Sequence, residues 1–212
     1  MAEKKNKSSL RENIEAVIIA VIIAMFIRTF IIQAFKIPSG SMLETLQIGD
    51  HILVNKFIYG IKIPFTDGKV LVSIKDPKKG DIVVFKFPVD PSKDFIKRVI
   101  ATEGDTIEII KKKIYVNGKL VKGAPYAIYR DNIIYPPNYP IPERAQRDNL
   151  RKITIPENKI FVMGDNRDNS HDSRFWGFVD LKAVKGQAFI IYWSWNKSEF
   201  GVRWNRIGDI LR

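Results

Sequence analysis

The sequence contains no cysteine and only two histidines, His51 and His171, among its 212 residues. Disulfide bonds and thiolate metal sites are therefore excluded, although the compartment in which the protein works stays open. So few nitrogen and sulfur ligands argue against a zinc site. The acidic stretch 165–172 lacks the glycine and the terminal glutamate of a calcium loop. We expect neither a metal ion nor another cofactor.

Acidic residues are also in short supply, with 23 Asp and Glu against 35 Lys and Arg, for a net charge of +12. Such an excess suits an anionic partner, either nucleic acid or a lipid surface, or simply makes a soluble basic surface. Apolar residues form 45% of the chain, so most of it should fold. The length allows one large or two small domains.

A helical period of useful length is missing after residue 36, where short β-branched runs bounded by Gly, Asp and Pro take over. Asn117-Gly118 between two such runs predicts a tight hairpin. We therefore expect a mainly β fold after residue 36. The predicted strands are 51–54, 80–85, 95–100, 106–110, 114–116, 119–121, 160–163 and 187–193.

The only long apolar run lies at residues 16–35 and would rise about 30 Å as a helix, the thickness of a hydrocarbon core. Arg28 interrupts it near one end, where its side chain can reach the interface. A buried core helix and a cleaved signal peptide are the alternatives, but the bulky Phe35-Lys36 makes a poor cleavage site. We expect an uncleaved, single-pass anchor, with basic residues holding the N-terminus in the cytoplasm.

Ser41 follows this run in the flexible segment Ile37-Pro38-Ser39-Gly40-Ser41-Met42. It is either a turn residue or a nucleophile, and a nucleophile needs a base. His171 has the acidic neighbours Asp168 and Asp172, but a solvated loop histidine is the preferred interpretation.

Lys97 is the other candidate base. Strand alternation places it on one face with Phe95 and Val99. Burial among such side chains can lower the pKa of a lysine by several units, to a range in which the amine accepts a serine proton. A lysine that extends from a strand edge into solvent is the competing interpretation, and alternation alone favours it.

A third segment, 164–177, is dense in short polar side chains and ends in an aromatic pair and glycine. It follows a predicted strand and should be a loop held by internal hydrogen bonds. It is either an ordinary surface loop or a structured wall around a site.

Taken in order, these segments resemble the bacterial type I signal peptidases, membrane-bound serine proteases with a Ser-Lys dyad. The resemblance rests on the anchor and on four boxes that span almost all of the external part, namely Pro38–Met42 with Thr45-Leu46, Gly80–Phe85, Lys97–Ile100 with Gly104-Asp105, and Gly164–Ser170 with Asp172–Arg174 and Trp176-Gly177.

The resemblance implies a role for each matching residue. Ser41 would be the nucleophile and Lys97 the general base, with the Ser39 hydroxyl and the Ser41 amide as the oxyanion hole. Ser170 would orient the lysine, while Arg98 with Asp165 and Asp172 with Arg174 would be supporting pairs. Shallow pockets for small substrate side chains would be lined by Ile37, Met42, Leu46, Phe95 and Ile96.

It also implies a β-rich catalytic core with an inserted second β region. The insertion includes the proline-rich stretch 123–158, which indicates a loop-rich excursion or edge ribbon. The predicted parts are a cytoplasmic segment 1–15, the anchor 16–35, the core in two pieces, 36–105 and 159–212, and the insertion 106–158.

The implied activity is removal of signal peptides from secretory preproteins, after small residues, on the extracytoplasmic face of the inner cell membrane. Its partners would be preproteins and the lipid bilayer, with no nucleic acid. Aromatic side chains near the C-terminus rest either on lipid or in the core. The alternatives are a non-enzymatic, membrane-anchored β module that binds anionic surfaces, and a Ser-Lys self-cleaving regulator, which the anchor disfavours.

Overall fold

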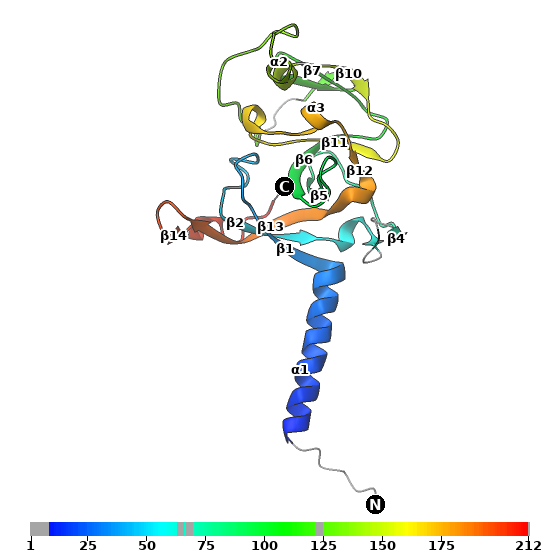
Figure 1. Cartoon of the computed structure of the whole chain (residues 1–212), viewed down its shortest axis with the longest axis vertical. Helices are drawn as coiled ribbons and strands as arrows, with labels where there is room; N and C mark the ends of the chain where they lie inside the picture. The colour runs from blue at the N-terminus through cyan, green and yellow to red at the C-terminus, as the bar shows by residue number, and fades with distance from the viewer. Residues whose placement is uncertain (1–8, 63–65, 67–69, 122–124, 212) are drawn as a thin grey trace, which may run out of the picture.

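The computed structural model describes residues 9–62, 66, 70–121 and 125–211. It consists of a β-rich body from which one long helix projects like a stalk (Figure 1). Lys4, Lys5 and Lys7, which contribute to the predicted orientation of the anchor, lie outside the described residues.

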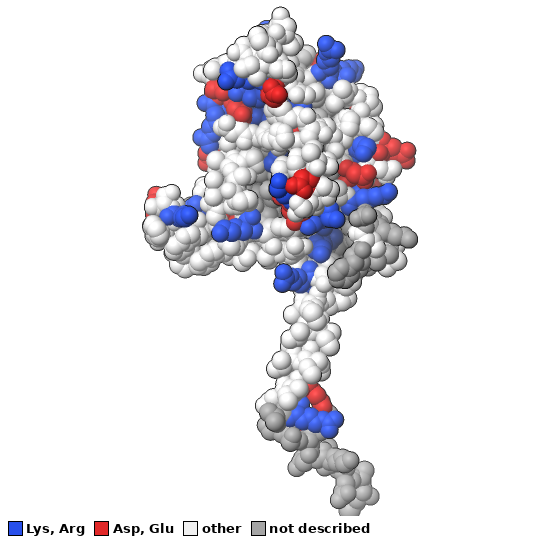
Figure 2. All heavy atoms as spheres, in the orientation of Figure 1, with Lys and Arg blue, Asp and Glu red and all other residues white. Residues whose placement is uncertain are grey.

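The stalk is α1 (Ser9–Phe26), which continues into the π-helical turn η1 (Ile27–Ile31). Residues 11–31 have a mean hydropathy of 2.5 and are not covered by the rest of the protein. By length and composition this helix can cross a membrane. Figure 2 shows an uncharged column with charged residues at both of its ends.

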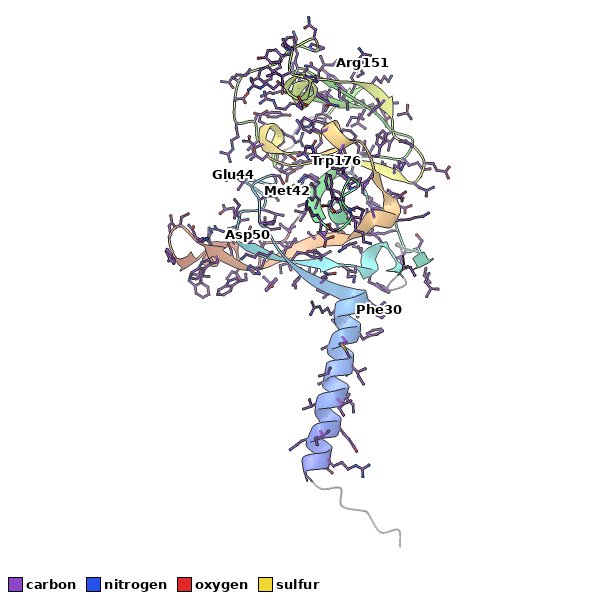
Figure 3. The ribbon with its side chains drawn as sticks, viewed as in Figure 1. Phe30, Met42, Glu44, Asp50, Arg151 and Trp176 are labelled. Carbon is purple, nitrogen blue, oxygen red and sulfur yellow. The ribbon has the colours of Figure 1, made fainter. Side chains whose placement is uncertain are left out.

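The predicted anchor extends too far toward the C-terminus. Helical structure ends at Ile31, and β1 (Ile32–Lys36) is a strand paired antiparallel with β2 (Asp50–Asn55). Ile32 and Phe35 suit either conformation, and the backbone hydrogen bonds offered by β2 decide for the strand. Arg28 consequently lies in the last helical turn before the body, close to Phe30, which Figure 3 marks at the junction.

The large sheet has the strand order β1-β2-β13-β5-β6-β11-β12, with β14 paired to one end of β13. Its longest strand, β13 (Val184–Asn196), joins β2 to β5 (Ile82–Lys86). β6 (Asp94–Thr102) lies between β5 and β11 (Lys159–Met163), so that its centre is buried. The sheet ends at β1 on one side and at β12 (Val179–Asp180) on the other, and β14 (Gly201–Val202) pairs with β13 alone.

A smaller sheet of order β10-β7-β8-β9 lies at the end of the body opposite α1 (Figure 1). It contains β7 (Thr106–Ile110), β8 (Lys113–Val116), β9 (Lys119–Leu120) and β10 (Leu150–Thr154). All four strands fall within the predicted insertion. Asn117 and Gly118 both have positive φ, 52° and 73°, as expected of the predicted tight hairpin.

Two short helices fall where the sequence shows no helical period. α2 (Pro142–Asp148) is a two-turn helix inside the proline-rich stretch, with Pro142 in its first turn, where proline suits a helix. α3 (Ser173–Trp176) is a single turn capped by the Asp172 carboxylate. Helices this short bury too few residues for a 3.6-residue period to be visible.

The remaining elements are short connections. They are β3 (Ile61–Lys62) paired with β4 (Val70–Val72), and the 3-10 turns η2 (Phe57–Tyr59), η3 (Arg167–Asn169), η4 (Leu181–Ala183) and η5 (Trp204–Arg206).

The core is divided into three apolar clusters. One lies beneath the segment around Ser41 and includes Met42, Leu46, Ile52 and Ile82. A second joins the small sheet to the large one through Ile107, Phe161 and their neighbours. The third, around Phe85 and Val99, fills the space beside β6. The strand that carries Lys97 is therefore supported by apolar packing on both faces.

Candidate active site

The loop that carries Ser41 is held to the body at both of its ends. Ile37 donates its amide to the Asp50 carbonyl at 2.8 Å, and Gly49 donates to the Ile37 carbonyl at 3.0 Å. Met42 and Leu46 are completely buried in the core below. Figure 3 shows Met42 inside the body and Glu44 at its side. The loop is thus fixed by its apolar residues, while Ser41 stays half-buried above them.

Lys97 reaches Ser41 from the middle of β6. Its Nζ lies 2.8 Å from Ser41 Oγ and 3.1 Å from the Ile96 carbonyl oxygen. The lysine is 4% exposed, because the strand is covered on both sides, so the interpretation as a solvated edge lysine is wrong. Burial lowers its pKa to about 8, against the opposing fields of Asp172 and Asp165.

The polar loop 164–177 forms the wall behind the serine. Asn166 donates its main-chain N–H to the Ser41 carbonyl at 3.1 Å and its side-chain amide to the Gly40 carbonyl at 2.9 Å. A Cβ at Gly164 would overlap the Ser41 carbonyl and the Ser170 side chain, so only glycine permits this close approach. Most of the loop is buried, so the interpretation as a solvated surface loop is wrong.

Two buried ion pairs stiffen this wall. The Arg98 guanidinium binds both oxygens of Asp165, at 2.9 and 2.8 Å, and Thr45 donates its hydroxyl to the same carboxylate at 2.6 Å. Arg174 likewise binds both oxygens of Asp172, at 2.9 Å each. Burial by itself raises the pKa of Asp172, but the adjacent Arg174 outweighs it and the pKa is lowered.

Other predicted residues are placed near the site without the contacts expected of them. Ser170 is buried beside Asp172, but its Oγ makes no well-formed hydrogen bond to Lys97 or to any other described group. Ser39 is exposed in the loop before Ser41. His171 is exposed and stacks on Phe175, with ring centroids 5.4 Å apart, and the described contacts do not join it to Ser41.

The predicted pocket residues divide into two groups. Phe95 and Ile96 are partly exposed and can contact a ligand, whereas Ile37, Met42 and Leu46 are core residues. That all five line pockets for substrate side chains therefore stays a prediction. Met42 and Leu46 have no accessible surface, and they form the floor that carries the loop.

Asn166 and Thr45 make contacts at the site, although the sequence does not single them out as site residues. Asn166 stands in the dense polar loop, which is itself a signal, but an asparagine between charged residues reads as an ordinary turn residue. Thr45 belongs to a box that carries the resemblance, yet only the fold brings it to Asp165 across 120 residues of chain.

A serine hydroxyl beside a buried amine whose pKa is lowered toward neutrality is an arrangement of serine hydrolases that use lysine as the base. Here it is built on a β-rich body behind an apolar helix, which defines the class as a membrane-anchored serine hydrolase.

Comparison with known proteins gives the family. Residues 10–193 match the family described as "Signal peptidase, peptidase S26". Signal peptidase I of Pseudomonas aeruginosa is 41% identical over 80% of this chain and 67% of its own length. That of Aquifex aeolicus is 36% identical over 87% of this chain and 85% of its own. A solved signal peptidase I from Enterococcus faecalis V583 has 30% identity and a TM-score of 0.41, covering 54% of this chain and 98% of that one.

The chain belongs to the signal peptidase family, peptidase S26. It is a serine endopeptidase of the bacterial signal peptidase I type, which removes signal peptides.

Proposed function

We propose that Ser41 and Lys97 form the catalytic dyad of this enzyme. The observation that carries the proposal is the 2.8 Å distance between Lys97 Nζ and Ser41 Oγ, inside a site where the lysine is buried and its pKa is about 8. A neutral amine at that distance can accept the hydroxyl proton as the serine attacks a carbonyl carbon.

The reaction then follows from the placement of the two groups. Attack of Ser41 Oγ on the scissile carbonyl gives a tetrahedral oxyanion, which we assign to the Ser41 amide and the Ser39 hydroxyl. Removing one such donor typically lowers the rate about 10²–10³-fold. The Lys97 ammonium returns its proton to the departing amine and leaves an acyl-enzyme. Water, deprotonated by the same lysine, then hydrolyses that ester.

The supporting residues act by holding these groups. The pairs Arg98–Asp165 and Arg174–Asp172 are charge-assisted and bidentate. They fix the loop that Asn166 attaches to Ser41. Ser170, next to Asp172, would turn its hydroxyl toward the amine when substrate is bound. Phe95 and Ile96 offer partly exposed apolar surface for the small side chains of a preprotein.

Substitution at both dyad positions tests the proposal. We expect Ser41→Ala and Lys97→Ala each to abolish cleavage, in detergent, of a preprotein with small residues before the cut. The exposed neighbours Ser92 and Lys93 supply matched controls, Ser92→Ala and Lys93→Ala, which should cleave normally. Circular dichroism and melting temperatures verify folding. Full activity of folded Lys97→Ala would exclude Lys97 as the general base of the dyad.

We further propose that the helix spans the inner membrane once, with the β body on the extracytoplasmic face. The chain has no cysteine, so single cysteines can report the orientation. In intact spheroplasts, an impermeant maleimide should label exposed Ser92→Cys at once and Glu12→Cys only after permeabilisation. The reverse labelling would overturn the orientation.

An apolar surface beside the stalk supports contact between the body and the bilayer. Phe200 and Trp204 are 81% and 74% exposed, and Trp193 and Trp195 are partly exposed next to them. β14 and β1 lie at the margin of the body from which α1 emerges (Figure 1), and Lys and Arg gather at the same junction (Figure 2). Exposed aromatic and basic side chains at one level are typical of a lipid interface.

Brominated lipids provide the measurement for this contact, since they quench tryptophans at short range. In proteoliposomes, Trp204→Phe should remove more of the quenchable fluorescence than Trp176→Phe, because Trp176 packs against Phe85 and Phe87 within the body. Equal losses would contradict lipid contact at Trp204.

A further inference from the structure

A cavity of about 400 Å³ lies in the inserted region, away from Ser41 and Lys97. Its walls come from the turn between β7 and β8, from β9, and from the segment 127–134, closed by Arg167 of the polar loop. The small sheet lies at the end of the body opposite α1 (Figure 1), so this cavity lies away from the apolar helix. The residues assigned to catalysis do not line it.

Arg167 is the unusual residue of this cavity. The residue is 2% exposed, yet within the described part of the chain its Nε has no hydrogen-bond partner and its guanidinium makes no ion pair. By contrast, the buried guanidiniums of Arg98 and Arg174 each donate hydrogen bonds to both oxygens of one carboxylate. A buried charge without a partner costs several kcal/mol, so the cost at Arg167 points to a group that is bound there.

The neighbouring carboxylates form ion pairs with other cations rather than with Arg167. Lys112 binds Asp168 at 2.8 Å and Asp131 at 2.9 Å. Arg147 binds Asp131 from the other side at 2.8 Å. The backbone of Arg167 is fixed as well, because its amide donates to the Ile128 carbonyl and its own carbonyl accepts from Arg174. The backbone of Arg167 is therefore fixed, while the Nε–H of its guanidinium has no partner among the described residues.

Further cations surround the same cavity. Lys111 and Lys112 form the tight turn between β7 and β8, and both have positive φ, 49° and 67°. Turns of this kind favour Asn and Gly, as at Asn117-Gly118 in the next hairpin, so two lysines here are conformationally costly. Lys113 follows them on the cavity wall. Four cationic side chains and one acidic side chain line the cavity.

The rest of the lining is apolar and includes Leu120, Ile134 and the ring of Tyr129. A planar guanidinium with free donors matches a carboxylate or a phosphate. A cavity that is apolar on its other side also needs a ligand with apolar atoms, and a bare inorganic anion would leave that side uncovered.

We propose that this cavity is a second binding site, which takes a carboxylate joined to an apolar body through Arg167, Lys111 and Lys113. An acidic residue flanked by apolar residues in an extended polypeptide has this chemistry, and so does a small aliphatic carboxylate. The site does not depend on the dyad, so it can be tested in a chain that lacks catalytic activity.

The test uses the full chain in detergent micelles with Ser41→Ala, which prevents cleavage of the probes. The Nε–H signal of Arg167 in a nitrogen–proton correlation spectrum is identified by its loss in Arg167→Lys. The probes are acetyl-Leu-Glu-Leu-amide, the matched acetyl-Leu-Gln-Leu-amide, hexanoate and inorganic phosphate. Calorimetry measures the affinity of each probe for the Ser41→Ala chain and for the same chain with Lys113→Gln added. Lys152→Gln, at an exposed lysine on β10, is the charge-matched control.

We expect the Glu peptide to shift the Arg167 signal and to bind at least about tenfold more tightly than the Gln peptide, as loss of a charged hydrogen-bonding group implies. Lys113→Gln should weaken that binding several-fold, and Lys152→Gln should leave it unchanged. Binding of hexanoate at the same signal would assign the site to small carboxylates as well.

Several results would overturn the proposal. They are equal affinity for the two peptides, an Arg167 signal that no carboxylate moves, and a response to phosphate alone. If Arg167→Lys fails to fold, the calorimetric comparison of Lys113→Gln with Lys152→Gln still decides.

Discussion

Asn166 donates its side-chain amide to the Gly40 carbonyl, and its main-chain N–H to the carbonyl of the next residue, Ser41. One residue of the polar loop thus binds the carbonyls of the two peptide units that flank the Cα of Ser41. Since 125 residues separate Asn166 from Ser41 in sequence, this contact couples two distant parts of the chain at the site.

Replacing Asn166 by Ala removes the Gly40 contact and leaves the main-chain contact intact. The lost hydrogen bond contributes about 1 kcal/mol, so we expect kcat/KM on a peptide substrate to fall about fivefold, mostly through kcat, with a small decrease in melting temperature. Asn169→Ala, an exposed substitution in the same loop, is the control and should be neutral. Equal activity of the two variants would show that the loop does not position Ser41.

The rate of cleavage should follow the titration of Lys97. Its pKa of about 8 means that the amine is mostly charged at pH 6 and mostly neutral at pH 9. Only the neutral amine can accept the serine proton. We therefore expect kcat/KM to rise about tenfold per pH unit below pH 8 and to level off above it. A flat profile from pH 6 to 9 would exclude Lys97 as the base.

The same pKa predicts how folding stability depends on pH. Below pH 8 the lysine is charged in both states, and the folded protein bears the cost of burying it. Between pH 8 and 10.5 the unfolded chain binds more protons than the folded one, so this contribution to stability rises with pH. The lowering of the Lys97 pKa from 10.5 to about 8 corresponds to about 3 kcal/mol of folding stability.

The substitution Lys97→Met isolates the contribution of Lys97 to the pH dependence of folding stability. In denaturant unfolding in detergent, the stability of Lys97→Met relative to wild type should be greatest near pH 7 and should decrease by about 3 kcal/mol toward pH 10.5. Lys93→Met, at an exposed lysine, should keep a constant difference from wild type. A constant difference for Lys97→Met would mean that its amine is not desolvated.

The buried pair between Arg98 and Asp165 should be costly to break from either side. Arg98→Met leaves the Asp165 carboxylate buried with Thr45 as its one side-chain partner among the described residues, and we expect a loss of about 3–5 kcal/mol of stability. Adding Asp165→Leu should recover part of it, because the unpaired charge is then removed. The exposed pair of Arg130 and Glu44 provides the control Glu44→Gln, which should change stability by less than about 1 kcal/mol. If the stability change of the double substitution equals the sum of the changes for Arg98→Met and Asp165→Leu alone, the two residues are not energetically coupled.

The sequence predicts the β-rich class and most of the strands because a half-buried strand shows its apolar face at every second residue. The hairpin at Asn117-Gly118 is predictable for a local reason too, since few residues accept positive φ. Elements without such a local signal were missed or misplaced. α2 is too short to show a period, and Ile32–Lys36 becomes a strand only because β2 pairs with it.

At the site, the amino-acid sequence by itself determined which residue types were available. A chain without cysteine and with only two histidines left a serine and a lysine as the candidate groups, and the family resemblance assigned them. Tertiary structure decided whether Lys97 could act as a base. Alternation along β6 leaves it free to reach solvent, whereas its place between β5 and β11 buries it and lowers its pKa. Burial depends on neighbours that are distant in sequence, and so does the cavity at Arg167.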